Sequence, residues 1–180
     1  MKLVNRKFND ILLLRPRLGG DETKHLSTWS YRDLSLLGIT TPFVQENHSF
    51  SKCNVLRGLH YQIKHPQGKL IMVFSGTIYD VVVDMRRSSP YFGRYAGFEL
   101  SASSSLSLWI PPGYAHGYYV ISEESVVLYS VTDYRFAEHE RTLCWNDEHL
   151  NISWPFGVEQ PLISDKDRCG VPFADADYYP

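Results

Sequence analysis

The sequence has few cysteines and no long hydrophobic run. Its three cysteines, Cys53, Cys144 and Cys169, are odd in number and include no CxxC pair, so neither a disulfide framework nor a cysteine-based zinc site is indicated. The longest aliphatic run near the start, residues 11–14, is far shorter than the about 20 residues of a membrane-spanning helix, and no signal-peptide pattern precedes it. We therefore expect a cytoplasmic protein that is neither exported nor membrane-spanning.

An excess of charge of one sign is also absent. The chain has 18 basic and 20 acidic residues and a formal net charge of −2, so no long-range field draws it to nucleic acid or to an anionic membrane. Neither partner is expected. An anionic ligand must instead be bound by a local cluster of basic side chains.

Apolar and aromatic residues are plentiful, at 43% and 14% of 180 residues, which excludes a disordered or collagen-like chain and fits one domain. From about residue 40, β-branched and aromatic runs alternate with Gly, Pro and Ser turns, which predicts an all-β sandwich or barrel. The expected strands are residues 54–62, 69–74, 77–84, 95–100, 105–110, 115–121 and 126–134, and residues 31–37 are a helix candidate. The last 25 residues are polar with scattered aromatics, as in a tail wrapped over a sheet or, alternatively, a solvated tail.

Two side chains stand out when alternate strand residues are assigned to opposite faces. Asp80 shares a face with Ile78 and Val82. If that face lies inside the barrel, the carboxylate needs a partner, because an isolated buried charge is costly; if it lies outside, Asp80 is a surface charge. Tyr129 shares its face with two valines and is predicted to be buried.

Most of the seven histidines are expected to be ordinary surface or core residues, but His60 and His116 lie at strand edges beside glycines. Glycine permits close approach of a ligand, so both fit a ligand-lined barrel interior. The Pro-x-Gly-x-x-His pattern that ends at His116 is similar to the second metal motif of cupin barrels. The paired histidines of the first motif are missing around His60, and two imidazoles fall short of the three protein ligands of a catalytic metal site. No metal is therefore expected.

Seven short stretches, in order and within residues 43–170, resemble one known family. They are NVLRGLHYQ, PQGKL, YDVVVDMRRSSPYFGRY, LWIPPGYAHGY, LYSVTDY, WND and SDKD. They closely resemble the dTDP-4-dehydrorhamnose 3,5-epimerase family. The resemblance implies a metal-free, cofactor-free cupin-type jelly-roll β-barrel with a few short helices, in a homodimer that swaps N-terminal strands. Residues 1–40 would be the N-terminal strands and arm, 41–140 the barrel core and 141–180 a C-terminal wrap. The implied enzyme serves deoxysugar synthesis for surface polysaccharide.

The implied reaction explains the residue types. The 4-keto group of a nucleotide-linked hexose acidifies the neighbouring C–H bonds, so epimerisation at C3 or C5 needs a base, an acid on the opposite face and a group that holds the enolate oxygen. The resemblance implies that His60 is the base and that Asp167 pairs with it. It further implies that Lys69 stabilises the enolate oxygen and that Tyr129 is the acid. From the residues alone, Asp167 is a surface charge in a polar tail.

The resemblance also implies residues that hold the substrate. His116 and Asp80 match polar residues that line the pocket. Arg57 matches an arginine suited to the diphosphate. Gln45 and Asn47 match a stretch near the nucleotide.

Arg57 and His60 are three residues apart, so a regular strand would point them to opposite faces. A bulge or twist at Gly58 would bring both inward. Without one, one of the two assignments is wrong.

Three positions depart from the family's pattern. Thr23 stands where the family has an arginine and Thr28 where it has an acidic residue; both positions contribute to nucleotide binding, which leaves the base (dTDP, CDP or GDP) open. Arg135, assigned to the substrate, replaces a tyrosine that shapes the sugar site. The alternatives are an epimerase that acts at C3 or C5 alone on a CDP- or GDP-linked sugar, a related keto-shifting isomerase, and a non-catalytic cupin that binds sugar nucleotides.

Overall fold

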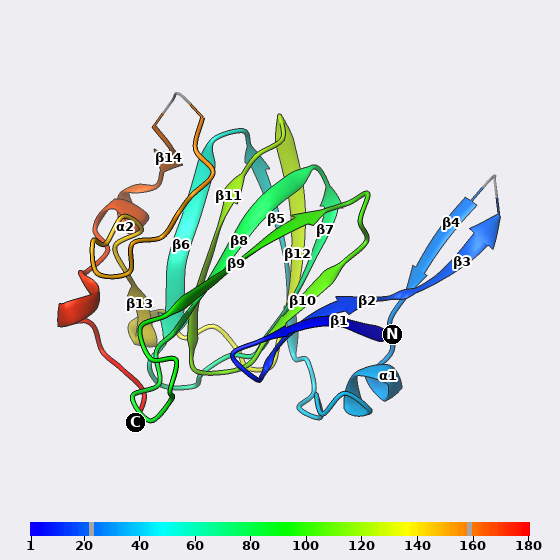
Figure 1. Cartoon of the computed structure of the whole chain (residues 1–180), viewed down its shortest axis with the longest axis horizontal. Coiled ribbons are helices and arrows are strands. Elements are labelled where there is room, and N and C mark those ends of the chain that lie inside the picture. The colour runs from blue at the N-terminus through cyan, green and yellow to red at the C-terminus, as the bar shows by residue number, and fades with distance from the viewer. Residues whose placement is uncertain (22–23, 158–159) are drawn as a thin grey trace.

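The chain folds into two antiparallel sheets that face each other (Figure 1), and the computed structural model describes residues 1–21, 24–157 and 160–180. In spatial order, the first sheet consists of β1 (Lys2–Lys7), β2 (Ile11–Arg15), β10 (Ser107–Ile110), β7 (Lys69–Ser75), β12 (Glu124–Val131) and β5 (Gln45–Lys52). The second consists of β13 (Glu140–Thr142), β6 (Val55–Gln62), β11 (Tyr114–Val120), β8 (Thr77–Asp84) and β9 (Tyr95–Ser101), with β14 (Leu162–Ile163) parallel to β6. This is the all-β jelly-roll class predicted from the sequence.

All seven predicted strands are present, with ends displaced by a few residues. Their β-branched and aromatic residues suit a pleated surface that is buried on at least one side. Strand β5 and the N-terminal strands had no individual prediction. β5 pairs along its whole length with β12, from Gln45 opposite Val131 to Lys52 opposite Glu124.

The helices are short. They are α1 (Tyr31–Ser35), α2 (Asp165–Arg168) and the 3-10 turns η1 (Ala137–His139) and η2 (Phe173–Asp175). In α1, the predicted helix, the Ser30 side chain accepts a hydrogen bond from the Asp33 amide, and Gly38 follows with a φ of +86°, so capping at both ends limits the helix. Among the described residues, no helix is long and apolar enough to span a bilayer.

The second sheet is buried on both faces. Val82 points into the core between the sheets, whereas Val81 and Val83 pack on the other side against the C-terminal segment, including Leu150 and Phe173. These described residues of the C-terminal segment therefore pack against the sheet rather than standing in solvent.

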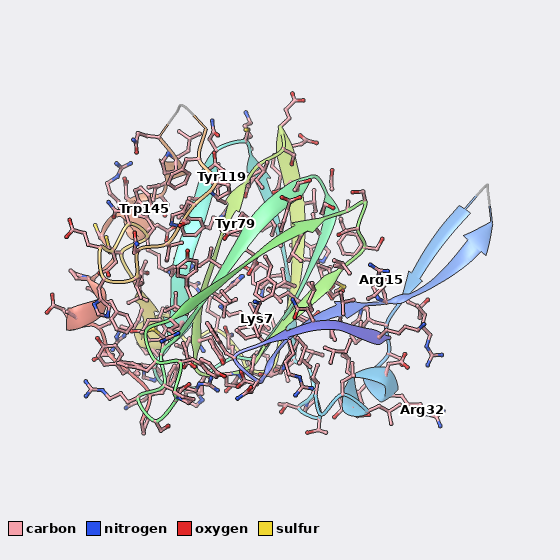
Figure 2. The ribbon with its side chains drawn as sticks, in the orientation of Figure 1. Lys7, Arg15, Arg32, Tyr79, Tyr119 and Trp145 are labelled. Carbon is pink, nitrogen blue, oxygen red and sulfur yellow. The ribbon has the colours of Figure 1, made fainter. Side chains whose placement is uncertain are left out.

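Aromatic rings strengthen this contact between the tail and the second sheet. Tyr79 of β8 and Tyr119 of β11 lie on the same side of the molecule as Trp145 of the tail (Figure 2). Tyr119 and Trp145 both meet the Phe156 ring edge-on, with centroids 5.0 and 5.6 Å away. Such pairs add to the stabilisation from burial alone.

Gly58 lies at a bulge in β6, as the spacing of Arg57 and His60 required. His116 lies opposite His60 and Tyr118 opposite Arg57, so a longer stretch of β6 is matched by a shorter stretch of β11. Gly58 has a φ of +108°, and a Cβ atom there would lie 2.7 Å from the Gly117 Cα. Only glycine fits this position, and the bulge turns Arg57 and His60 towards the same cavity.

A hairpin of β3 (Arg17–Asp21) and β4 (Lys24–Thr28) projects from the barrel (Figure 1). The two strands pair with each other, while β1 and β2 join their own chain's sheet through β10. Of the family departures in this region, Thr28 ends β4 and is exposed, and Thr23 lies outside the described residues.

Candidate active site

A cavity of about 360 Å³ opens between the two sheets, within the usual range for small-molecule sites. Strands β5, β7 and β12 form one wall, β6 and β11 form the other, and β13 and α2 contribute to the lining. The predicted site residues that line it are Gln45, Asn47, Arg57, His60, Lys69, His116, Tyr129, Arg135 and Asp167. Asp80 is fully buried behind His116, with which it forms a hydrogen bond. The fold therefore brings all ten predicted residues together.

His60 and Asp167 form a hydrogen-bonded pair through the histidine Nε2. The His60 side chain is 31% exposed and faces the cavity, whereas that of Asp167 is 4% exposed. Burial alone would raise the pKa of Asp167, but hydrogen bonds from His60, Ser164 and the Gly58 backbone outweigh it and lower that pKa. The carboxylate is therefore ionised and can stabilise a protonated His60.

A second pair joins His116 and Asp80, deeper in the barrel. The His116 Nε2 lies 2.7 Å from the Asp80 Oδ2, and the other carboxylate oxygen has no hydrogen-bond partner among the described residues. Burial raises the pKa of Asp80 and lowers that of His116, since both charged forms lose hydration.

Lys69 reaches from one wall of the cavity to the other. It starts on β7, and its Nζ donates a hydrogen bond to the His60 carbonyl oxygen on β6 at 3.4 Å. Burial lowers its pKa to about 8, although the negative charges of Asp80 and Glu140 oppose the shift. The ammonium is thus poorly hydrated and close to the base, where it can donate to a developing oxyanion.

Tyr129 stands on the wall opposite His60. It lies on the inward face of β12 with Val127 and Val131, which are fully buried, and packs against the core. Burial raises its pKa, while the positive charge of Arg57 opposes the shift. The phenol is therefore neutral, with a proton available at the cavity.

Two groups of polar residues define the β5 end of the cavity. The Arg57 Nε donates to the Ser51 Oγ at 2.9 Å, and its Nη2 donates to the Phe50 carbonyl at 3.1 Å. Gln45 donates to the Asn47 side-chain oxygen at 2.8 Å. Both arrangements hold their donors in place before a ligand arrives.

Sequence reasoning missed several other lining residues. They are Ser49, Tyr61, Gln62, Gln67, Tyr118, Glu140, Ser164 and Lys166. Several alternate along a strand with predicted residues, as Ser49 does with Asn47 on β5. Lys166 lies in the SDKD stretch beside Asp167, but no sequence signal identified Glu140.

The two cavity histidines each contact one carboxylate. Within the described part of the chain, no three His, Cys, Asp or Glu side chains form a group that could hold a metal ion.

Comparison with known proteins identifies the family. A sequence model of the dTDP-4-dehydrorhamnose 3,5-epimerase family matches residues 5–175. The chain belongs to this family. The dTDP-4-dehydrorhamnose 3,5-epimerase of Pseudomonas aeruginosa is 46% identical over 183 residues, covering 100% of both chains. A similar solved structure is the dTDP-6-deoxy-D-glucose-3,5-epimerase of Legionella pneumophila in complex with dTDP-4-keto-L-rhamnose, with a TM-score of 0.93, 40% identity and coverage of 98% of this chain and 94% of that one. Another is the dTDP-4-dehydrorhamnose 3,5-epimerase of Bacillus anthracis with TDP and pyrophosphate bound, with a TM-score of 0.91, 41% identity and coverage of 95% of this chain and 98% of that one.

Family membership confirms the cupin-like fold and the enzyme class. The chain is an epimerase of a nucleotide-linked 4-keto-6-deoxy sugar in deoxysugar biosynthesis. The non-catalytic alternative has no support among these relatives.

Proposed function

We propose that this epimerase inverts both C3 and C5 of a dTDP-linked 4-keto-6-deoxyhexose. The observation that carries the proposal is the placement of His60 and Tyr129 on opposite walls of one cavity, with the Lys69 ammonium beside His60. A base and an acid on opposite faces of a flat enolate are what inversion requires. The relatives named for this substrate support the choice of dTDP.

His60 starts the reaction. Its Nε2 is engaged by Asp167, so Nδ1 takes the proton from the carbon next to the ketone. The C–H electrons move to the carbonyl oxygen, which becomes an enolate that Lys69 stabilises, while Asp167 stabilises the imidazolium.

Tyr129 completes the inversion. Its phenol delivers a proton to the opposite face of the same carbon, and the electrons return from the oxygen to form the new C–H bond. The His60 proton leaves to solvent, and the phenolate recovers a proton from solvent. The second carbon is inverted by the same steps.

The remaining residues hold the substrate. Arg57 binds the diphosphate, Gln45 and Asn47 contact the nucleotide, and His116, fixed by Asp80, donates to the sugar. Arg135 lines the sugar end of the cavity. Its replacement of the family's tyrosine favours, as a second candidate, a variant of the reaction at one carbon only.

We further infer a cytoplasmic homodimer. The three cysteines are free. The β3–β4 hairpin projects away from its own barrel, where it can reach a partner's cavity. Phe50 and Phe74, on β5 and β7 of the first sheet, are 56% and 62% exposed, and exposed apolar patches of this kind are typical of an interface.

Incubation in deuterated water with dTDP-, CDP- and GDP-linked 4-keto-6-deoxyhexoses tests the reaction by mass spectrometry and proton NMR. Two deuterium atoms taken up with the dTDP sugar would support the proposal. Uptake of one would make the enzyme a single-site epimerase. No uptake from any sugar that binds would overturn the proposal.

A further inference from the structure

Three charged side chains form an ionic bridge in the lining of the cavity: Arg135, Glu140 and Lys166. The Arg135 Nε and Nη2 each donate to one Glu140 oxygen at 2.9 Å. The Lys166 Nζ donates to the Glu140 Oε2 at 2.8 Å. One carboxylate thus binds two cations, one of them through the two-pronged geometry that holds arginine most firmly.

The ionic bridge connects β13, the neighbour of the strand that carries His60, to α2, the helix that carries Asp167. Glu140 lies on β13, which pairs with β6. On these strands Thr142 lies opposite His60, and Glu140 is two residues away from Thr142. Lys166 precedes Asp167 on α2. The bridge therefore joins the strand beside the base to the helix that carries the base's partner.

Helix α2 cannot hold Asp167 in place by itself. It has four residues, and so short a helix is unstable without tertiary contacts. The Ser164 side chain caps it, and Lys166 ties it to Glu140. The contact with Glu140 is thus an anchor for α2 on the side towards β13.

The charges of the bridge also reach the residue that stabilises the enolate. The groups that act on the pKa of Lys69 are Asp80 of β8, Glu140 of β13 and Lys166 of α2, with His116 of β11 close by. The negative charge of Glu140 raises the Lys69 pKa, whereas the positive charge of Lys166 lowers it. The hydrogen bonds and positive charges of Arg135 and Lys166 together lower the pKa of Glu140 to about 2 against the effect of burial, so Glu140 is ionised throughout the working range.

We propose that the ionic bridge holds α2 against β13 so that Asp167 stays aligned with His60. Glu140 and Lys166 are then positioning residues for proton abstraction, and Arg135 fixes the Glu140 carboxylate. This inference rests on the proposed role of His60 as the base.

Two substitutions separate positioning from electrostatics. Glu140→Gln and Lys166→Met both cut the contact between β13 and α2, but they change the charge near Lys69 in opposite directions. Asp177→Asn is the matched control. Asp177 accepts a hydrogen bond at 2.6 Å from Arg141, which lies on β13 next to Glu140, and Asp177 is outside the cavity lining. Lys166→Arg keeps the cation and should restore the contact.

The rate of deuterium exchange into the dTDP sugar is measured at saturating sugar concentration over a range of pH. Thermal unfolding of each variant is measured alongside. We expect Glu140→Gln and Lys166→Met each to lower kcat by about tenfold, because small misplacements of reacting groups are costly. Lys166→Arg and Asp177→Asn should stay within about twofold of the original enzyme. The alkaline limb of the profile should move to lower pH in Glu140→Gln and to higher pH in Lys166→Met.

Opposite changes of kcat in Glu140→Gln and Lys166→Met, or an unchanged kcat in both, would overturn the proposal that the ionic bridge positions Asp167. The proposed function would fail separately, through absence of exchange in the original enzyme or through full exchange in His60→Asn.

Discussion

The two cavity histidines have the same kind of partner and different surroundings. Asp167 receives several hydrogen bonds that lower its pKa, and His60 is open to the cavity. Within the described part of the chain, one oxygen of Asp80 has no hydrogen-bond partner, burial raises the pKa of Asp80, and His116 is buried. The first pair can therefore accept and hold a proton, whereas the second is suited to hold one fixed geometry.

Replacing His60 by asparagine should lower deuterium exchange by about a thousandfold or more, because an amide cannot take up the proton that the proposed base removes. The barrel should remain folded, since the ring is partly exposed. Exchange and thermal unfolding are measured together. His48→Asn is the control, because His48 is exposed on the outer face of β5, where it pairs with Glu46. Retained exchange in His60→Asn would refute its role as the base.

Replacing Tyr129 by phenylalanine should separate the two halves of the reaction. His60 can still remove and return a proton on its own face, so exchange should continue while epimerised product falls by about a hundredfold. Proton NMR of the product distinguishes the two. Tyr91→Phe, at a ring stacked on Phe8 away from the cavity, is the control. Normal product formation would make Tyr129 a packing residue.

Lys69 should determine the alkaline limb of the rate. Its pKa is lowered to about 8 by burial, and only the ammonium form stabilises the enolate. The cation is present below that pKa and lost above it, so kcat/KM should fall as pH rises through about 8. A pH profile of kcat/KM checks this, and a rate that stays flat to pH 10 would contradict it.

The bulge at Gly58 is the decisive feature at the scale of elements. Replacing Gly58 by alanine places a Cβ atom 2.7 Å from the backbone of residues 116 and 117 and strains a φ of +108°. We expect a loss of about 2 kcal/mol or more of stability and a large loss of exchange, because Arg57 and His60 would no longer share a face. Thermal unfolding and exchange assays measure both.

Gly157→Ala is the matched control for the bulge, since no atom of the described residues lies within 4 Å of a Cβ atom there. Equal stability of the two alanine variants would show that β6 tolerates a regular register.

Strand β5 and helix α2 show why some elements escape sequence reasoning. β5 alternates polar residues, of which Gln45, Asn47 and Ser49 face the cavity, so it lacks the apolar face that identifies a strand. Its strand state comes from pairing with β12. Asp167 likewise belongs to a four-residue helix in a polar tail, and only the wrap of that tail buries it.

At the scale of the whole molecule, the exposed phenylalanines and the projecting hairpin both support the proposed homodimer. Sedimentation velocity should give a dimer, and the double substitution of Phe50 and Phe74 by glutamate should shift it to about half the mass, because charges in an apolar interface are costly. Leu36→Glu, at the 81% exposed residue that follows α1, is the control. A fully active monomer would contradict the proposed dimer.

Strand periodicity predicts the all-β class and the seven central strands, and the motif stretches indicate the family and, through that resemblance, ten of the residues at the cavity. Local pattern suffices for these, because strand periodicity and motif stretches are written in neighbouring residues. The burial of Asp80, the shared face of Arg57 and His60 and the link from Arg135 through Glu140 to Lys166 come from the packing of the folded chain. These depend on contacts between segments far apart in the chain, such as β6 with α2, which no local pattern contains.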